Sequence, residues 1–203
     1  MKIQTKDKIR TITTVAIMSA VATVLMVLEF SVPLVPVFLK FDFANLPALL
    51  VSFAIGPWAG VAVEFIRNLL HLPFSHTFFA GELANFIMSS AFILSAGLIY
   101  RCLKTRKGAI IASVSGAVAS AIISLPVNYY VSYPVYFKVF APEEVILDMY
   151  KAILPSVHTL WEALLIFNLP FTFVKGIICA LITFFIYKPL SPILKGKKKG
   201  KTE

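Results

Sequence analysis

The sequence predicts an all-α integral membrane protein with six transmembrane helices, and three observations lead to this prediction. Of the 203 residues, 59% are apolar and only 14% are charged, whereas soluble domains are closer to half apolar and a quarter charged. Several apolar stretches reach the roughly 20 residues that a helix needs to cross a bilayer. Of the 19 lysines and arginines, 14 lie in three short segments, at residues 1–10, 101–107 and 188–201.

The apolar stretches define the elements in order along the chain. A first helix is predicted over residues 11–30, and residues 45–70 form an apolar region that Gly56-Pro57 interrupts. Glycine at the end of one helix and proline at the start of the next are typical of such a break. Further elements are predicted at residues 78–100, 109–135 and 159–187 as spans, and at residues 142–153 as a surface helix.

The break at Gly56-Pro57 decides the number of helices. A single helix over residues 45–70 would place the basic segment 101–107 on the opposite side of the membrane from the N-terminus. A turn at residues 55–58 instead places every basic segment on one side, and basic loops stay in the cytoplasm. We therefore expect six helices over residues 11–188, with cytoplasmic segments at 1–10 and 189–203. The two short helices, 46–55 and 57–70, would be about 15 and about 21 Å long, less than the bilayer thickness.

The sequence contains no motif of a known enzyme class, since GxxxxGK[ST], HExxH and GxSxG are all absent. His71 and His76 flank Pro73 at a spacing that does not suit a metal site, and Cys102 and Cys179 form no CxxC pair. We expect no catalytic residue, metal, cofactor or nucleic-acid partner. Anionic lipid headgroups account for the Lys-rich tail.

Polar side chains inside the predicted helices are the candidate ligand contacts. Lys175 is the most unusual of them, because a lysine in mid-membrane costs about 2.5–3.5 kcal/mol unless it faces a partner or a cavity. Helical spacing places several such residues on shared stripes in the outer half of the bilayer. They are Glu82, Asn85 and Ser89 on one helix, Asn128 on the next, and Asn168, Thr172 and Lys175 on the last.

These groups suit a flat heteroaromatic ligand that is held by stacking and a few hydrogen bonds. The alternative is that each polar residue binds a neighbouring helix, with Lys175 paired to Glu82 or Glu162. Glu64 and Arg67 are predicted to pair within one helix, because they are three residues apart. Glu29 is expected at the outer membrane interface.

Two segments are expected to contact something beyond the helix bundle. The apolar, proline-rich loop 31–44 is predicted to be a lid over a site open to the exterior, or else to lie in the headgroup layer. Ala16, Ala20 and Thr23 form a stripe of small residues on the first helix. Such stripes allow close helix contact, so this stripe is a candidate docking surface for another membrane protein.

Taken in order, several segments resemble the substrate-binding S components of energy-coupling factor vitamin transporters, and most of all their riboflavin-binding branch. The resemblance covers nearly the whole chain. Besides Ala16-xxx-Ala20, it rests on FLKFDFANLPALL (38–50), GPWAGVAVEFIRNLLH (56–71), GELANFI (81–87), LPVNYYVSYPVY (125–136) and NLPFTFVKG (168–176).

The resemblance implies a six-helix fold in a prokaryotic cell membrane, with riboflavin bound near the outer face under the loop that follows the first helix. It implies that Ala16 and Ala20 pack on a transmembrane coupling subunit, which works with two ATPase subunits. A thiamine or biotin S component and a membrane enzyme acting on lipids are the alternatives. The ligand contacts that the resemblance implies are Glu82, Asn128, Thr172 and Lys175, together with Asp42 and Asn85.

Overall fold

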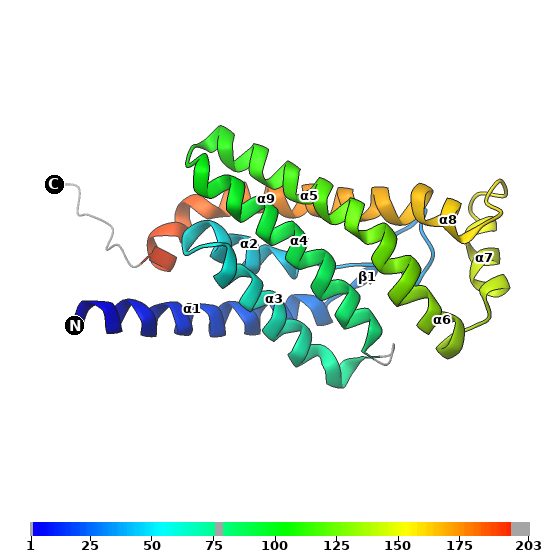
Figure 1. Ribbon diagram of the computed structural model, residues 1–203, viewed down its shortest axis with the longest axis horizontal. Coiled ribbons are helices and arrows are strands. Elements are labelled where there is room, and N and C mark those ends of the chain that lie inside the picture. Colours follow the sequence, from blue (N-terminus) through cyan, green and yellow to red (C-terminus); the bar gives the residue numbers. More distant parts are fainter. Residues whose placement is uncertain (1, 76–78, 196–203) are drawn as a thin grey trace.

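The computed structural model describes residues 2–75 and 79–195 as an elongated bundle of helices (Figure 1). A small antiparallel hairpin, in which Phe30 pairs with Phe41, joins the first two helices. The elements in chain order are α1 (Lys2–Val27), β1 (Phe30–Ser31), β2 (Lys40–Phe41), α2 (Asn45–Ala54), α3 (Pro57–His71), the 3₁₀ turn η1 (Leu72–Phe74), α4 (Ala80–Cys102), α5 (Arg106–Val127), the π-helical turn η2 (Asn128–Ser132), α6 (Tyr133–Val139), α7 (Glu143–Lys151), α8 (Leu160–Ala163), the π-helical turn η3 (Leu164–Asn168) and α9 (Leu169–Lys195).

Within the described residues, four helical segments are long and apolar enough to cross a membrane. They are Asp7–Val27, Ala80–Cys102, Arg106–Val139 and Leu160–Tyr187. The third consists of α5, η2 and α6 in continuous succession, and the fourth combines α8, η3 and most of α9. The structure therefore confirms a helical membrane protein, with the shorter helices α2 and α3 between the first and second of these segments.

The predicted break between α2 and α3 is present, and Gly56 makes it possible. The φ angle of Gly56 is +149°, a backbone conformation that residues with a Cβ atom rarely adopt. Pro57 then opens α3 at its first position, where its missing N–H costs nothing. Both short helices approach α4 closely at Gly97, since a Cβ there would lie 2.2 Å from the Oγ atom of Ser52 in α2 and 2.8 Å from the Cβ atom of Pro57 in α3.

Several boundaries differ from those predicted. The first helix begins at Lys2 and ends at Val27, since the basic segment continues the helix and does not precede it. The predicted surface helix is α7, which starts after Pro142 because that residue is extended, with ψ at 156°. The span predicted from residue 78 starts at Ala80; residues 76–78 lie outside the described part of the chain, as do residues 196–203 of the predicted tail.

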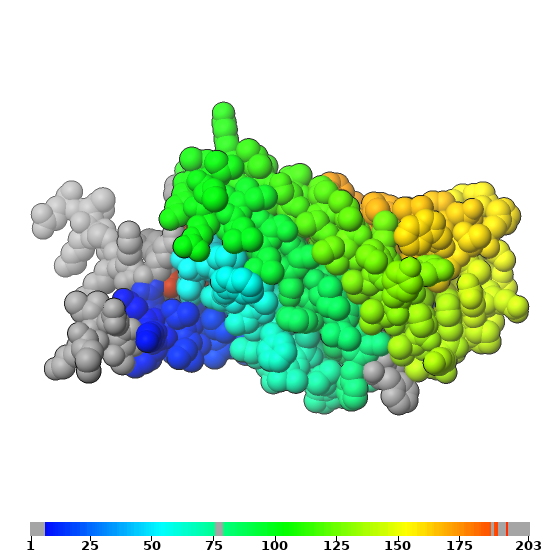
Figure 2. Space-filling view, viewed as in Figure 1, coloured from blue at the N-terminus to red at the C-terminus, as the bar shows by residue number. Residues whose placement is uncertain are grey.

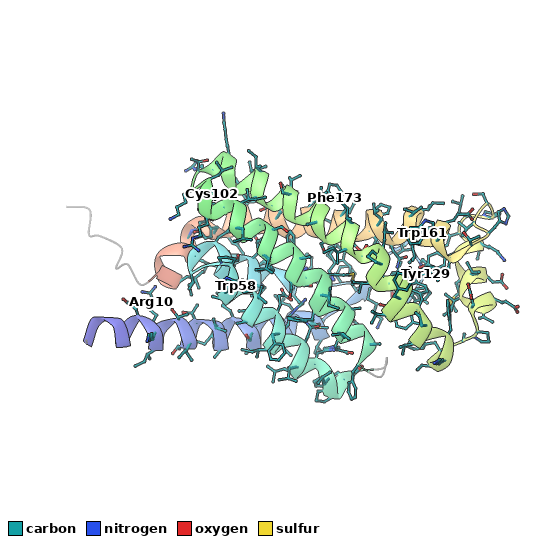
Figure 3. All side chains as sticks on the ribbon, in the orientation of Figure 1. Arg10, Trp58, Cys102, Tyr129, Trp161 and Phe173 are labelled. Atoms are coloured by element: carbon teal, nitrogen blue, oxygen red, sulfur yellow. The ribbon has the colours of Figure 1, made fainter. Side chains whose placement is uncertain are left out.

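The main apolar core lies where one face of α1 meets α2, α3, α4, α5 and α9, and a second cluster lies among α6, α7, α8 and η3. Figure 2 shows α3, α4 and α5 side by side over one face of the molecule. The start of α1, the α4–α5 connection and the last turns of α9 lie at one end of the bundle, and α7 lies at the other (Figure 1). Trp161 and Tyr129 are close together in the half that contains α7, with ring centroids 5.6 Å apart, whereas Trp58 lies in the other half (Figure 3).

Candidate binding site

A cavity of about 650 Å³ opens among the hairpin, the end of α3 and the helices α4, α5 and α9. All six residues predicted from the sequence as ligand contacts line it, as do Ser89 and Asn168. These residues come from segments far apart in the chain, so the structure brings the predicted set together in one place. The six are Asp42, Glu82, Asn85, Asn128, Thr172 and Lys175.

Lys175 is paired with Asp42, whose Oδ2 atom lies 2.7 Å from the lysine Nζ atom. The alternative in which Lys175 pairs with Glu82 or Glu162 was wrong. The reason is that Asp42 follows the hairpin directly and lies beside α9. The two residues are 133 positions apart, and helical periodicity does not predict a contact between separate segments. Burial alone would raise the pKa of Asp42, but the charges of Lys175 and Arg67 and the hydrogen bonds to the carboxylate outweigh burial and hold that pKa below its ordinary value.

Glu82 has partners of its own at the start of α4. Its Oε1 atom is 3.0 Å from His71 Nδ1, and its Oε2 atom accepts a hydrogen bond from Ser75 at 2.7 Å. Glu162 is half-buried and accepts hydrogen bonds from backbone N–H groups at the start of α8. Both carboxylates are therefore hydrogen-bonded without Lys175.

Asn128 and Asn168 each belong to a π-helical turn, η2 or η3. Proline follows closely in both places, at Pro134 and Pro170. A proline lacks the N–H that continues an α-helical ladder, and π-turns recur at functional sites. The two wide turns therefore place an amide at corresponding points on two long helices that border the cavity.

The side-chain amide of Asn168 binds neighbouring helices, which is the alternative that the sequence analysis gave for the polar residues. Its Oδ1 atom accepts from the Tyr150 hydroxyl at 2.7 Å, and its Nδ2 atom donates to the Tyr133 hydroxyl at 3.1 Å. The two tyrosine hydroxyls also contact each other. Burial raises the pKa of Tyr150 above its ordinary value. The hydrogen bond from Tyr150 to Asn168 ties α7 to η3.

The Thr172 and Asn128 side chains retain hydrogen-bonding capacity toward the cavity. The Thr172 hydroxyl donates to the backbone oxygen of Asn168 at 2.8 Å, one turn earlier, so the remaining capacity of its oxygen is as an acceptor. The side-chain amide of Asn128 lines the cavity and can both donate and accept.

The segment predicted to be a lid, residues 31–44, contributes one side of the cavity. Phe38, Leu39 and Lys40 line the cavity from this side. The ring of Phe38 stands edge-on to three tyrosines, at centroid distances of 5.8 to 6.3 Å: Tyr133, Tyr136 and Tyr150. Glu29 lies at the rim and pairs with Lys40 at 2.9 Å, which fastens the base of the lid to the end of α1.

The pair of Glu64 and Arg67 is confirmed at 2.6 Å, and both side chains are wholly buried. Sequence reasoning missed that Arg67 also reaches Asn45, Asn85 and Ser89. It therefore missed Asn45, which lines the cavity. One signal was available: an arginine has five donors, and a single carboxylate three residues away leaves several of them unused.

Two of the three residues of the predicted docking stripe on α1 face away from the bundle, whereas the third, Thr23, is half-buried. Ala16 and Ala20 are exposed, whereas Val15, Ser19 and Ala22 on the other side of the helix are buried. Large apolar side chains surround the stripe and are about half exposed. They include Ile12, Ile17, Val21 and Val24.

Comparison with known proteins gives concordant results. The profile of the family described as ECF transporter, substrate-specific component, matches residues 10–187. The riboflavin transporter RibU of Staphylococcus aureus (strain TCH60) is 29% identical over 182 residues, or 90% of each chain. The riboflavin transporter FmnP of Bacillus subtilis (strain 168) is 30% identical over 196 residues, or 95% of this chain and 98% of the relative.

A solved structure described as the S component of a bacterial ECF transporter has the same fold. Its TM-score is 0.73 at 29% sequence identity, and the match covers 93% of this chain and 99% of that one. The comparison thus extends from the basic N-terminal segment through most of the last helix.

Proposed function

The chain belongs to the family of substrate-specific components of ECF transporters, and from this we propose that it is the riboflavin-binding subunit of an ATP-driven uptake transporter. Such a protein is a carrier and not an enzyme. It is a multi-pass protein of a prokaryotic cell membrane, which agrees with the four apolar segments of membrane length.

The observation that supports this proposal best is the convergence of six polar residues on one cavity. Its volume of about 650 Å³ falls within the range of roughly 300–1,000 Å³ that is usual for small-molecule sites. Buried polar groups in a membrane protein are costly and generally serve a function. A scattered set of packing contacts would not collect at one cavity.

The lining matches the chemistry of riboflavin, which has a flat ring system and a hydroxylated side chain. The Lys175 ammonium can donate to a ring carbonyl while it keeps its contact with Asp42, because it carries three protons. Glu82 and Thr172 can accept from hydroxyl groups, and the Asn128 amide can do either. Phe38, Tyr136 and Phe171 offer ring faces and edges for contact with the flat ring system.

We further propose that α2 and α3 act as a pair of short crossings, which makes six in all and places both termini in the cytoplasm. The start of α1, the basic α4–α5 connection and the end of α9 lie at one end of the bundle, in support of this topology (Figure 1). The cavity then opens toward the exterior. Residues 1–10 and 189–203 would flank the membrane domain on the cytoplasmic side, in contact with lipid headgroups.

The exposed stripe of Ala16 and Ala20 is the proposed contact for the transmembrane coupling subunit. Its partner ATPase subunits would supply the energy, because the sequence contains no nucleotide-binding motif. This chain would capture riboflavin from outside, close the hairpin over it, and deliver it inward only as part of the assembly.

A ligand titration tests the proposed function. The purified protein in detergent should quench riboflavin fluorescence with saturation at one ligand per chain, and protein from riboflavin-supplied cells should be yellow. Thiamine and biotin serve as competitors and should not displace the flavin. A colourless protein that gives no saturable response to riboflavin would refute the proposal.

A further inference from the structure

Arg67 lies behind one wall of the cavity and holds side chains of that wall by hydrogen bonds. Its Nη2 atom donates to the Oδ1 atoms of Asn45 and Asn85, at 2.8 and 3.4 Å. The same atom lies 3.0 Å from the Oγ atom of Ser89. Asn45, Asn85 and Ser89 all line the cavity and are here called the amide wall. One guanidinium on α3 thus holds side chains from both α2 and α4.

The guanidinium decides which way the two amides face. It carries donors only, so an amide can meet it only with the oxygen. Ser89 Oγ lies 3.0 Å from both amide oxygens and adds a further donor on the same side. The Nδ2 atoms of Asn45 and Asn85 must then point away from Arg67. The Nδ2 atom of Asn85 accordingly donates to the Sδ atom of Met26 at 4.0 Å, a weak hydrogen bond to another residue that lines the cavity.

We propose that Arg67 is a positioning residue that fixes Asn45 and Asn85 with their N–H groups toward the cavity, so that the site selects oxidised riboflavin over its reduced form. The inference rests on the proposed function and goes beyond it, because it assigns specificity to a residue behind the cavity wall. Without Arg67 each amide could turn by half a rotation and offer its oxygen instead.

The chemistry of the ligand explains why this orientation discriminates. One edge of the oxidised ring system carries two carbonyl oxygens and the unprotonated nitrogens N1 and N5, which accept hydrogen bonds, and the N3–H group between the carbonyls, which donates in both redox forms. Two-electron reduction adds a proton to N5 and, in the neutral form, to N1, so acceptors become donors. A donor facing a donor leaves both without a partner, and a buried polar group without a partner is strongly unfavourable.

The variant must remove Arg67 without leaving Glu64 as a buried charge that has no partner. Both side chains are wholly buried and paired at 2.6 Å, and breaking such a pair by removing one partner is strongly destabilising. Replacing both partners with apolar residues of similar size is often neutral. The double variant Glu64→Met/Arg67→Met therefore removes the guanidinium while the α3 core stays filled.

The experiment compares oxidised and photochemically reduced riboflavin by anaerobic calorimetric titration of the wild type and the double variant. The wild type should bind the oxidised form at least about tenfold more tightly. In the double variant this ratio should fall to within about threefold of unity. Ser52→Ala is the matched control. It removes a buried hydroxyl of α2 that donates to the backbone oxygen of Ile93 at 3.3 Å and is not part of the amide wall. The ratio of the two affinities should remain that of the wild type.

A second variant tests the same idea with Arg67 in place. In Asn85→Asp, an oxygen replaces the cavity-facing N–H group, and the charge lies near the guanidinium. The preference for oxidised riboflavin should shrink by at least about tenfold. This test remains informative when the double variant does not fold.

Two results would overturn the inference. One is a wild type that binds both redox forms equally. The other is a folded variant, of either kind, that weakens both forms by the same factor and leaves the ratio unchanged. Neither result bears on the proposed function, which fails only when the wild type does not bind riboflavin at all.

Discussion

At the scale of single residues, the pairing of Lys175 with Asp42 connects the lid to the last helix. The ammonium is 16% exposed and the carboxylate 5%, so each charge depends on the other for its stabilisation. Mid-membrane lysines need such a partner or a polar cavity, and Lys175 has both. Its place on the cavity wall makes it the clearest candidate for a direct ligand contact.

Replacing Lys175 with alanine should weaken riboflavin binding by about 1.5–3 kcal/mol, because a charged hydrogen bond to the ligand is lost. The measurement is a fluorescence titration of the purified variant, with thermal unfolding followed in parallel. Lys151→Ala is a suitable control, since Lys151 also pairs with an aspartate, but on the exposed surface of α7. Unchanged affinity together with reduced stability would show that Lys175 serves packing alone.

Sequence reasoning at this scale succeeded where contacts repeat along one helix. Helical spacing correctly predicted that Glu82 and Asn85 lie on one face and that Glu64 pairs with Arg67. It failed where partners are far apart in the chain, because a contact between separate elements has no periodic signature. The Asp42 carboxylate beside Lys175 is the clearest example of such a contact.

At the scale of elements, α7 packs against the hairpin segment that lines one side of the cavity. The buried hydroxyls of Tyr133 and Tyr150 meet at the Asn168 amide, which fastens α7 to the two helices beneath it. Phe38 of the hairpin packs against both tyrosine rings. The hairpin therefore packs on two tyrosine rings whose hydroxyls belong to a small buried hydrogen-bond network.

Tyr150→Phe should destabilise the protein by about 1–2 kcal/mol, because it leaves the Asn168 oxygen without its 2.7 Å donor. Denaturant or thermal unfolding in detergent measures this. Tyr130→Phe provides the control, since Tyr130 is 74% exposed and should be nearly neutral. Equal stabilities for the two variants would contradict the role assigned to the network.

Ala16→Leu should leave riboflavin affinity unchanged and impair assembly with the coupling subunit, because a larger side chain prevents close approach of the helices. Co-purification with the coupling and ATPase subunits measures assembly. Ala152→Leu is the matched control, an exposed alanine at the end of α7. Normal assembly of Ala16→Leu, or a loss of ligand affinity, would show that the docking surface lies elsewhere.

The predicted elements were largely confirmed, including the break at Gly56, because apolar length and helix-breaking residues are local signals. Boundaries at the first and last helices were less accurate, since charged residues continue a helix beyond the apolar stretch without any local mark. The π-turns at Asn128 and Asn168 were not predicted at all. They depend on how Pro134 and Pro170 interrupt the backbone ladder within a packed bundle.

At the scale of the whole molecule, topology and function depend on each other. A cavity that captures a vitamin from outside must open at the end opposite the basic segments. Cys102 lies next to the basic α4–α5 connection and is exposed, whereas Cys179 is buried. The chain therefore carries a natural probe for the orientation of this end.

A membrane-impermeant maleimide should label Cys102 in inside-out vesicles and leave it unlabelled in intact cells. Mass spectrometry of the labelled protein measures this, and Cys102→Ser should abolish the signal, because Cys179 is buried. Labelling of Cys102 in intact cells would place the basic segment outside and reverse the proposed topology.

The central claim is that polar groups from separate segments form one riboflavin site beneath the hairpin. An experimental structure of the protein with riboflavin bound tests it most directly. The ligand should occupy the cavity, within hydrogen-bonding distance of Lys175, Glu82, Asn128 and Thr172. Riboflavin bound elsewhere, with these side chains turned away from it, would contradict the account.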